Sequence, residues 1–168
     1  MTKEEQYAAL LPQVKALCEG ETDIIAKMAN VSALLHQEFG FLWTGFYRVE
    51  NLKMKIENSV DATNNPQFSI LNSQLVLGPF QGPIACVHID YGRGVCGTAW
   101  KERHPVVVPD VEEFPGHIAC SSESRSEIVV PVFRDEEIIA VLDIDSRELA
   151  TFDDTDAHWL ENIVTFIP

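Results

Sequence analysis

Two strand-like segments, residues 127–133 and 138–145, constrain the fold of this chain more than any other feature. Both are rich in β-branched and other apolar residues, and only Arg134-Asp-Glu-Glu137 separates them. A parallel return to the same sheet needs a crossover of about a dozen residues or more, so these strands must pair antiparallel. The short connection therefore predicts an α+β fold, in which helices cover an antiparallel sheet.

Other segments with the same character predict a sheet of about six strands. They are rich in β-branched and aromatic residues and are bounded by turn signals such as Gly78-Pro79 and Gly82-Pro83. The further strands are expected at 41–49, 75–80, 84–90 and 105–109. Residues 51–73, between the strands at 41–49 and 75–80, form a polar, Asn-rich stretch that we interpret as an extended loop.

Helices are predicted at both ends of the chain and between the strands. Thr2 and Glu5 form a capping-box pattern before a helical stretch that we expect to be interrupted at Pro12. Apolar residues at three- and four-residue spacing predict a helix over 22–39, and Gly40 follows where a left-handed cap belongs. A short helix fits 95–103, and acidic residues from Asp153 onward suit the start of a last helix.

Composition and charge exclude several classes of function. The 168 residues suit a single domain, and 46% hydrophobic with 23% charged residues is the composition of an ordinary globular protein. The net charge of −14 disfavours nucleic acids and acidic membranes as partners. The sequence has no membrane span, and its start lacks a secretory signal. We therefore expect a reducing, cytoplasmic location, in which the four cysteines are thiols at rest.

A glycine-rich stretch, Gly92-Arg-Gly-Val-Cys-Gly97, matches the dinucleotide-binding pattern G-x-G-x-x-G. That pattern binds a dinucleotide within a parallel βαβ unit, with an acidic residue about twenty positions further on to hold the ribose. Here the stretch lies in an antiparallel context, so the motif alone is a weak signal. We interpret it mainly as a tight strand-to-helix turn, which small residues permit.

The cysteines allow three interpretations. Cys18 lies in the first predicted helix and is expected to be inert core. The other three could be buried small hydrophobic residues, zinc ligands or a reactive thiol with neighbouring resolving thiols. Zinc would draw on a set of six donors: Cys86, His88, Cys96, His104, His117 and Cys120. Their cysteines are 10 and 24 residues apart, which does not match the usual pairing of structural zinc ligands, so we predict no metal and favour thiol chemistry.

Six segments together give the chain a resemblance to a known family. They are Trp43-Thr-Gly-Phe-Tyr47, Leu75-Val-Leu-Gly-Pro-Phe-Gln-Gly82, Gly92-Arg-Gly-Val-Cys-Gly-Thr98, Phe114-Pro-Gly-His-Ile-Ala-Cys120, Ser126-Glu-Ile-Val-Val130 and Val141-Leu-Asp-Ile-Asp-Ser146. With these segments the chain resembles the free methionine-(R)-sulfoxide reductases, which are single GAF-domain enzymes. The resemblance covers almost the whole chain and implies one GAF domain over residues 1–168. It departs from the family at 51–73, where a shorter turn is expected.

The resemblance implies roles for three cysteines. Cys120 corresponds to the cysteine that attacks the sulfoxide, Cys86 to the principal resolving cysteine, and Cys96 to a third, less essential one. Attack by Cys120 would release methionine and leave a sulfenic acid, with which Cys86 condenses to an intramolecular disulfide. No cofactor is implied. Thioredoxin is the implied reductant, free methionine sulfoxide the implied substrate, and a homodimer the implied assembly.

The resemblance also assigns the substrate pocket. Trp43 corresponds to the tryptophan that lines the methyl-group pocket, and the matching carboxylates are Glu127, Asp143 and Asp145. A sulfoxide becomes electrophilic when its oxygen is protonated, for which Glu127 and Asp143 are the candidates. Asp145 could accept hydrogen bonds from the ammonium group of the free amino acid. Without the resemblance, the carboxylates could be surface charges and the tryptophan ordinary core.

Two rival functions follow from the same sequence. A GAF module that senses a small ligand without catalysis would share the fold, although the intact cysteines argue against it. A peptide-methionine sulfoxide reductase would share the chemistry but accept N-acylated substrate.

Overall fold

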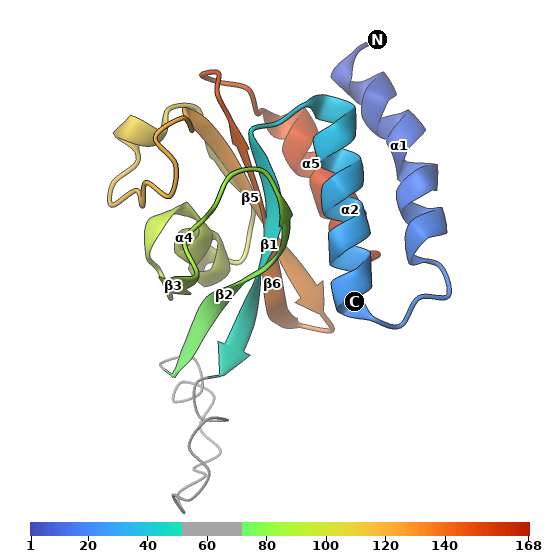
Figure 1. The fold of residues 1–168 in the computed structure, drawn as a ribbon, viewed down its shortest axis with the longest axis horizontal. Helices are drawn as coiled ribbons and strands as arrows, with labels where there is room; N and C mark the ends of the chain where they lie inside the picture. The colour runs from blue at the N-terminus through green and yellow to red at the C-terminus, as the bar shows by residue number, and fades with distance from the viewer. Residues whose placement is uncertain (52–71) are drawn as a thin grey trace, which may run out of the picture.

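The computed structural model describes residues 1–51 and 72–168, and its centre is a six-stranded sheet (Figure 1). The strands are β1 (Trp43–Asn51), β2 (Ser73–Gln81), β3 (His88–Asp90), β4 (Val106–Val108), β5 (Ser126–Arg134) and β6 (Glu137–Ser146). They lie in the order β3-β2-β1-β6-β5-β4, and every neighbouring pair is antiparallel. The predicted α+β class with an antiparallel sheet of about six strands is confirmed.

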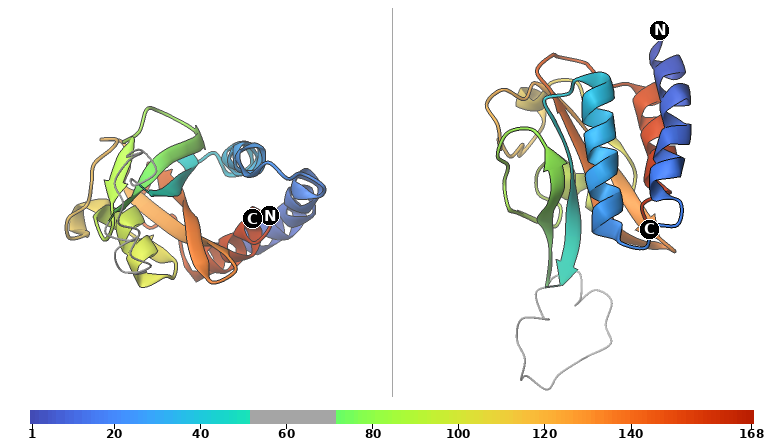
Figure 2. Two further views of the ribbon diagram at one scale, coloured as in Figure 1. Left: turned by 90° about the horizontal axis from the view of Figure 1, so that it is seen from below. Right: turned by 45° about the vertical axis from the view of Figure 1, so that its right-hand side comes forward.

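Helices cover both faces of the sheet, but unequally. The helices are α1 (Lys3–Cys18), α2 (Ile24–Phe39), α4 (Gly94–Glu102) and α5 (Asp154–Val164), with a short 3-10 turn, η2, at Val111–Glu113. The long helices α1, α2 and α5 lie on one side, whereas α4 and the connections around it lie on the other (Figure 2). In the described part of the chain, no helix is both long enough and apolar enough to cross a membrane.

The helix ends follow the sequence signals closely, with one exception. The Thr2–Glu5 capping box forms, and Gly40 ends α2 in the left-handed conformation. The predicted interruption at Pro12 is wrong, because α1 continues through it. A proline inside a helix costs about 3 kcal/mol. Burial of Leu10 and Val14 on either side offsets this cost, since tertiary packing supplies most helix stability in proteins.

Two strand predictions also need correction. The expected strand over 84–90 is reduced to β3, and residues 84–87 run as an irregular connection. β1 and β2 extend further than expected, so that Asn51 pairs with Ser73 at the boundaries of the predicted loop. The remainder of that loop, 52–71, lies outside the described residues.

The two faces of the sheet bury different residues because side chains alternate along each strand. Phe46, Leu142 and Ile144 face the layer of long helices, in an apolar core closed by α1, α2 and α5. Trp43 and Tyr47 occupy the alternate positions of β1, so their side chains point to the other face, toward α4. This second, thinner side of the sheet carries the polar residues that the sequence singled out.

Candidate active site

A pocket opens on the α4 side of the sheet and collects most of the predicted site residues. It is lined by Trp43, Cys96, Cys120, Glu127, Asp143 and Asp145. Strands supply the tryptophan and the carboxylates, the start of α4 supplies Cys96, and the connection between η2 and β5 supplies Cys120. Cys86, in the connection between β2 and β3, adjoins the pocket through its bond to Cys120. The structure therefore brings together side chains that are up to 102 residues apart in sequence (from Trp43 to Asp145).

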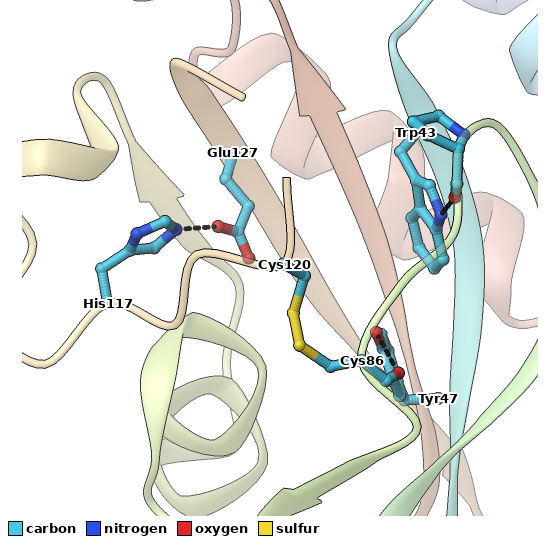
Figure 3. Close-up of a disulfide and its surroundings, with 7 residues drawn as sticks. Trp43, Tyr47, Cys86, His117, Cys120 and Glu127 are labelled. Atoms are coloured by element: carbon cyan, nitrogen blue, oxygen red, sulfur yellow. Dashed lines mark hydrogen bonds and ion pairs between the residues drawn. A yellow bond between two sulfur atoms is a disulfide. The ribbon is translucent and has the colours of Figure 1, made fainter. Parts of the chain in front are cut away.

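Cys86 and Cys120 form a disulfide, with Cα atoms 5.5 Å apart (Figure 3). Both residues are partly exposed, so their sulfurs are not simple core hydrophobes. The Tyr47 hydroxyl donates a hydrogen bond of 3.0 Å to the backbone oxygen of Cys86 and so fixes this side of the bond. Cys96 is a free thiol, only 3% exposed, and Cys18 is a free thiol buried in the layer of long helices.

Strand register places the three carboxylates on one face. Asp145 of β6 lies directly opposite Glu127 of β5 and, on its other side, opposite Trp43 of β1. Asp143, two residues before Asp145, points to the same face. Glu127 and Asp143 are each only 6% exposed, which removes the alternative that they are surface charges. The Ser124 hydroxyl donates a short hydrogen bond to the partly exposed Asp145.

Burial and mutual repulsion shift the titration of this cluster. Burial, followed by the charge of Asp145, raises the pKa of Glu127 well above its usual value. The pKa of Asp143 is raised by burial and by both neighbouring carboxylates. Burial raises the pKa of Asp145 to about 6, against the opposing effect of the Ser124 hydrogen bond. The pocket thus favours the protonated forms of Glu127 and Asp143.

The same environment affects Cys96. Burial raises the pKa of its thiol, and the nearby carboxyl groups of Asp143 and Glu127 raise it further. Thiolates rather than thiols attack electrophiles, so Cys96 is a poorer nucleophile than an exposed cysteine would be.

Trp43 forms one apolar wall of the pocket. Its ring stacks against Phe80 at 5.3 Å and Tyr47 at 5.8 Å between centroids, and its Nε1 donates to the backbone oxygen of Pro83 at 3.1 Å. Gly45 makes room for this ring, since a Cβ atom there would lie 2.5 Å from the indole carbon Cη2. The indole is therefore held in one orientation.

Among the pocket residues that were not predicted as site residues, three make a polar side-chain contact with a predicted one. His117 Nε2 lies 3.5 Å from Glu127 Oε2, with its side chain 15% exposed. Tyr47 and Ser124 fix Cys86 and Asp145 as described above. The sequence offered one signal for His117, namely its position three residues before Cys120, but it was weighed only as a zinc ligand. No local pattern distinguishes Tyr47 or Ser124, whose roles depend on tertiary contacts.

The structure does not assemble the zinc ligands considered from the sequence, and it gives the glycine-rich stretch a packing role. Cys86 and Cys120 are bonded to each other, and His88 and His104 are exposed on the surface, so the six-donor set does not assemble. The glycine-rich stretch forms the end of the turn after β3 and the first residues of α4. A Cβ atom at Gly97 would lie 2.5 Å from the backbone oxygen of Asp90, so this glycine serves close packing.

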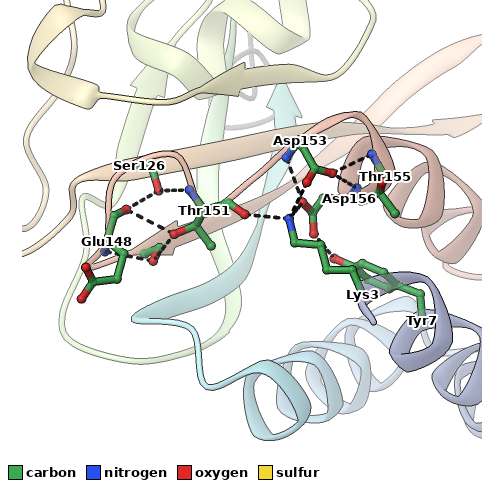
Figure 4. A network of polar contacts seen from close by, with 9 residues as sticks. Lys3, Tyr7, Ser126, Glu148, Thr151, Asp153, Thr155 and Asp156 are labelled. Atoms are coloured by element: carbon green, nitrogen blue, oxygen red, sulfur yellow. Dashed lines mark hydrogen bonds and ion pairs between the residues drawn. The ribbon is translucent and has the colours of Figure 1, made fainter. Parts of the chain in front are cut away.

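A network behind the pocket holds the start of β5, just before Glu127 (Figure 4). The Ser126 hydroxyl donates to the backbone oxygen of Glu148 at 2.6 Å and accepts from the Thr151 amide at 3.4 Å. The Thr151 carbonyl in turn accepts from the Lys3 ammonium at 2.7 Å. The N-terminal helix is thereby tied to the segment that positions Glu127.

Comparisons with known proteins agree with this geometry. The GAF-domain profile matches residues 56–167. The chain is 48% identical to GAF domain-containing protein A of Dictyostelium discoideum, over 99% of this chain and 92% of that protein. It is 43% identical to the free methionine-R-sulfoxide reductase of Escherichia coli, over 98% and 87% respectively.

Solved structures show the same relationship. The free methionine-R-sulfoxide reductase of Neisseria meningitidis, determined in complex with its substrate, superposes with a TM-score of 0.84 at 46% identity, covering 99% of this chain and 89% of that one. The two proteins are thus similar in both sequence and fold over nearly the whole length of this chain. The chain therefore belongs to the free methionine-R-sulfoxide reductase family of GAF-domain proteins.

Proposed function

We propose that this chain reduces free L-methionine (R)-sulfoxide to methionine, with Cys120 as nucleophile and Cys86 as resolving thiol. The observation that carries the proposal is the Cys86–Cys120 disulfide at a pocket that also holds Trp43 and a row of buried carboxyl groups. The related enzymes from E. coli and N. meningitidis support the choice of substrate. We also take residues 1–168 as one GAF domain, because β1, which precedes the matched residues 56–167, pairs with β2 and β6, which lie within them.

In the first step the Cys120 thiolate attacks the sulfur of the sulfoxide. The sulfur–oxygen bond of the substrate breaks, and its oxygen passes to the cysteine. Methionine leaves with its sulfur reduced by two electrons, and the Cys120 sulfur, which supplies these electrons, becomes a sulfenic acid. The proton that the oxygen requires comes from a neighbouring acid.

Glu127 and Asp143 suit the role of acid, because burial raises their pKa values and so favours the protonated form that can donate a proton. Asp145, with a pKa of about 6, is mostly ionised near neutral pH and suits a different role, which is to bind the substrate's ammonium group. Trp43 supplies an apolar wall for the methyl group. This division of roles favours the free amino acid over a methionine within a peptide, whose nitrogen carries no charge.

In the second step the Cys86 thiol displaces water from the Cys120 sulfenic acid, and the disulfide forms. A dithiol reductant of the thioredoxin class then restores both thiols by exchange. We extend the proposal to a reducing, cytoplasmic setting, where such a reductant is available, and to a homodimer, which sedimentation would test.

The test of the proposal is methionine release from each sulfoxide epimer and from N-acetylmethionine sulfoxide, with dithiothreitol as reductant. The wild type is expected to act on the free R epimer, and Cys120→Ser to fall to background, because a serine hydroxyl is hardly ionised at neutral pH. Cys18→Ala is the matched control and should keep full activity. Binding of the sulfoxide without turnover would instead favour a sensing module, and equal rates with the acetylated substrate would favour a peptide reductase.

A further inference from the structure

We propose that Cys96, Glu127 and Asp143 form a binding site for a thiophilic divalent cation, with Zn²⁺ as the best match. One donor atom from each side chain lies within 4.8 Å of the other two. The three come from different elements, α4, β5 and β6, so no single loop creates the cluster. This set shares only Cys96 with the zinc ligands considered from the sequence.

The distances require only small movements to close around the ion. Zinc binds sulfur at about 2.3 Å and carboxylate oxygen at about 2.0–2.2 Å, so neighbouring donors of a tetrahedral site lie about 3.5 Å apart. The donors already lie within 4.8 Å of one another, and rotation of the glutamate and aspartate side chains would bring them to that separation. One thiolate with two carboxylates suits zinc better than magnesium or calcium, which prefer oxygen donors alone.

A second observation points to a ligand at this cluster. Asp143 Oδ1 is buried and has no hydrogen-bond partner among the described residues. Among the described residues, His117 Nε2 lies 3.5 Å from the Glu127 carboxyl group. No lysine or arginine of these residues forms an ion pair with Glu127 or Asp143. A buried polar oxygen without a hydrogen-bond partner is costly. A bound Zn²⁺ would use this free oxygen and offset most of the negative charge that the three ligands carry once they lose their protons.

The ion has a route to these donors, because Cys96, Glu127 and Asp143 all line the pocket. Binding replaces the S–H bond of Cys96 with a Zn–S bond and releases that proton, with those of protonated carboxyl groups, to the solvent. Three protein donors leave a fourth position of a tetrahedral ion open, and this position would take water. The site is complete in the disulfide form, since Cys96 is free while Cys86 and Cys120 are bonded.

The test is a Co²⁺ titration of the oxidised protein, in which Cys86 and Cys120 cannot act as ligands. The wild type and the matched control Cys18→Ala should show a thiolate-to-cobalt charge-transfer band, and Zn²⁺ should displace it. Cys96→Ser should lose the band. Asp143→Asn should weaken binding by at least about tenfold, the lower range for loss of even an outer contact of a metal site.

Thiol counting and circular dichroism verify that each variant keeps the disulfide and the fold, and Glu127→Gln gives a second carboxylate variant should Asp143→Asn fail this check. Absence of the band in the wild type, or its persistence in Cys96→Ser, would overturn the proposal. A consequence that rests on the proposed function is that Zn²⁺ inhibits the reduced enzyme competitively with sulfoxide. An inactive protein that still binds Co²⁺ would refute the function and leave the metal site standing.

Discussion

Replacing Asp145 with asparagine should make the protein more stable at neutral pH while weakening the binding of its proposed substrate. Burial raises the pKa of this carboxyl group from 3.8 to about 6. The folded state therefore holds the proton more tightly than the unfolded state does. Between these two pKa values the folded protein binds more protons, so its stability falls as the pH rises through that window.

The size of the effect follows from the shift. One pKa unit corresponds to about 1.4 kcal/mol, so the ionised Asp145 costs the folded state about 3 kcal/mol above pH 6. Asparagine has the same shape, can accept the Ser124 hydrogen bond and carries no charge. Asp145→Asn should thus be more stable than the wild type by up to about 3 kcal/mol at pH 7.5, and about equal to it below pH 4.

Urea unfolding of the disulfide form at pH 7.5 and pH 4 measures this difference. Glu161→Gln, at an exposed position of α5, is the matched control and should change stability by less than about 0.5 kcal/mol at both values. In activity assays Asp145→Asn should raise KM more than it lowers kcat, because the ammonium contact exists before and during the reaction. A variant equally destabilised at both pH values would refute the electrostatic reasoning, whereas an unchanged KM would refute only the ammonium contact.

Three other changes have defined outcomes. Cys86→Ser should release about one methionine per enzyme in a single turnover but fail to cycle with thioredoxin, whereas Cys96→Ser should keep most of that cycling; the reverse pattern would make Cys96 the resolving thiol. Gly45→Ala should cost about 1–3 kcal/mol in chemical unfolding and raise KM, because its Cβ would lie 2.5 Å from the indole ring of the pocket; wild-type kinetics would show that this ring does not contact substrate. Asp156→Asn should lower the free energy of unfolding by about 1.5–3 kcal/mol, since this buried carboxylate accepts the Tyr7 hydroxyl at 2.9 Å; an unaffected urea midpoint would contradict it.

The fold was predictable wherever short-range signals and global packing agree. The four-residue connection at 134–137 required an antiparallel pair, and β5 and β6 form one. The prediction failed at Pro12 because the burial of flanking residues, which the local sequence does not report, outweighs a local penalty. The strand prediction failed at 84–87, where a tertiary contact again outweighs the local pattern. These residues leave the sheet beside β2, and Cys86 bonds to Cys120 instead.

The location of the carboxylates shows a limit of sequence reasoning more clearly. A register shift between Val132 and Phe133 leaves Ile139 without a partner and advances the pairing of β5 and β6 by one residue. Without this bulge, Glu127 would lie opposite Ile144 instead of Asp145. A slip of one residue moves side chains to the other face, so the acidic row depends on the bulge. Nothing in the local sequence marks its position, and only the resemblance brought these three residues into one site.

The division of the site between strands and connections has a chemical consequence. Glu127, Asp143 and Asp145 project from paired strands, whose positions are fixed by the sheet on both sides. Cys86 and Cys120 lie on connections, which are less constrained than strands. Opening or closing their disulfide can therefore be accommodated by the connections while the acids keep their places. An acid that must meet the sulfoxide oxygen in each cycle is best held on such a rigid element, because small displacements of catalytic groups are costly in rate.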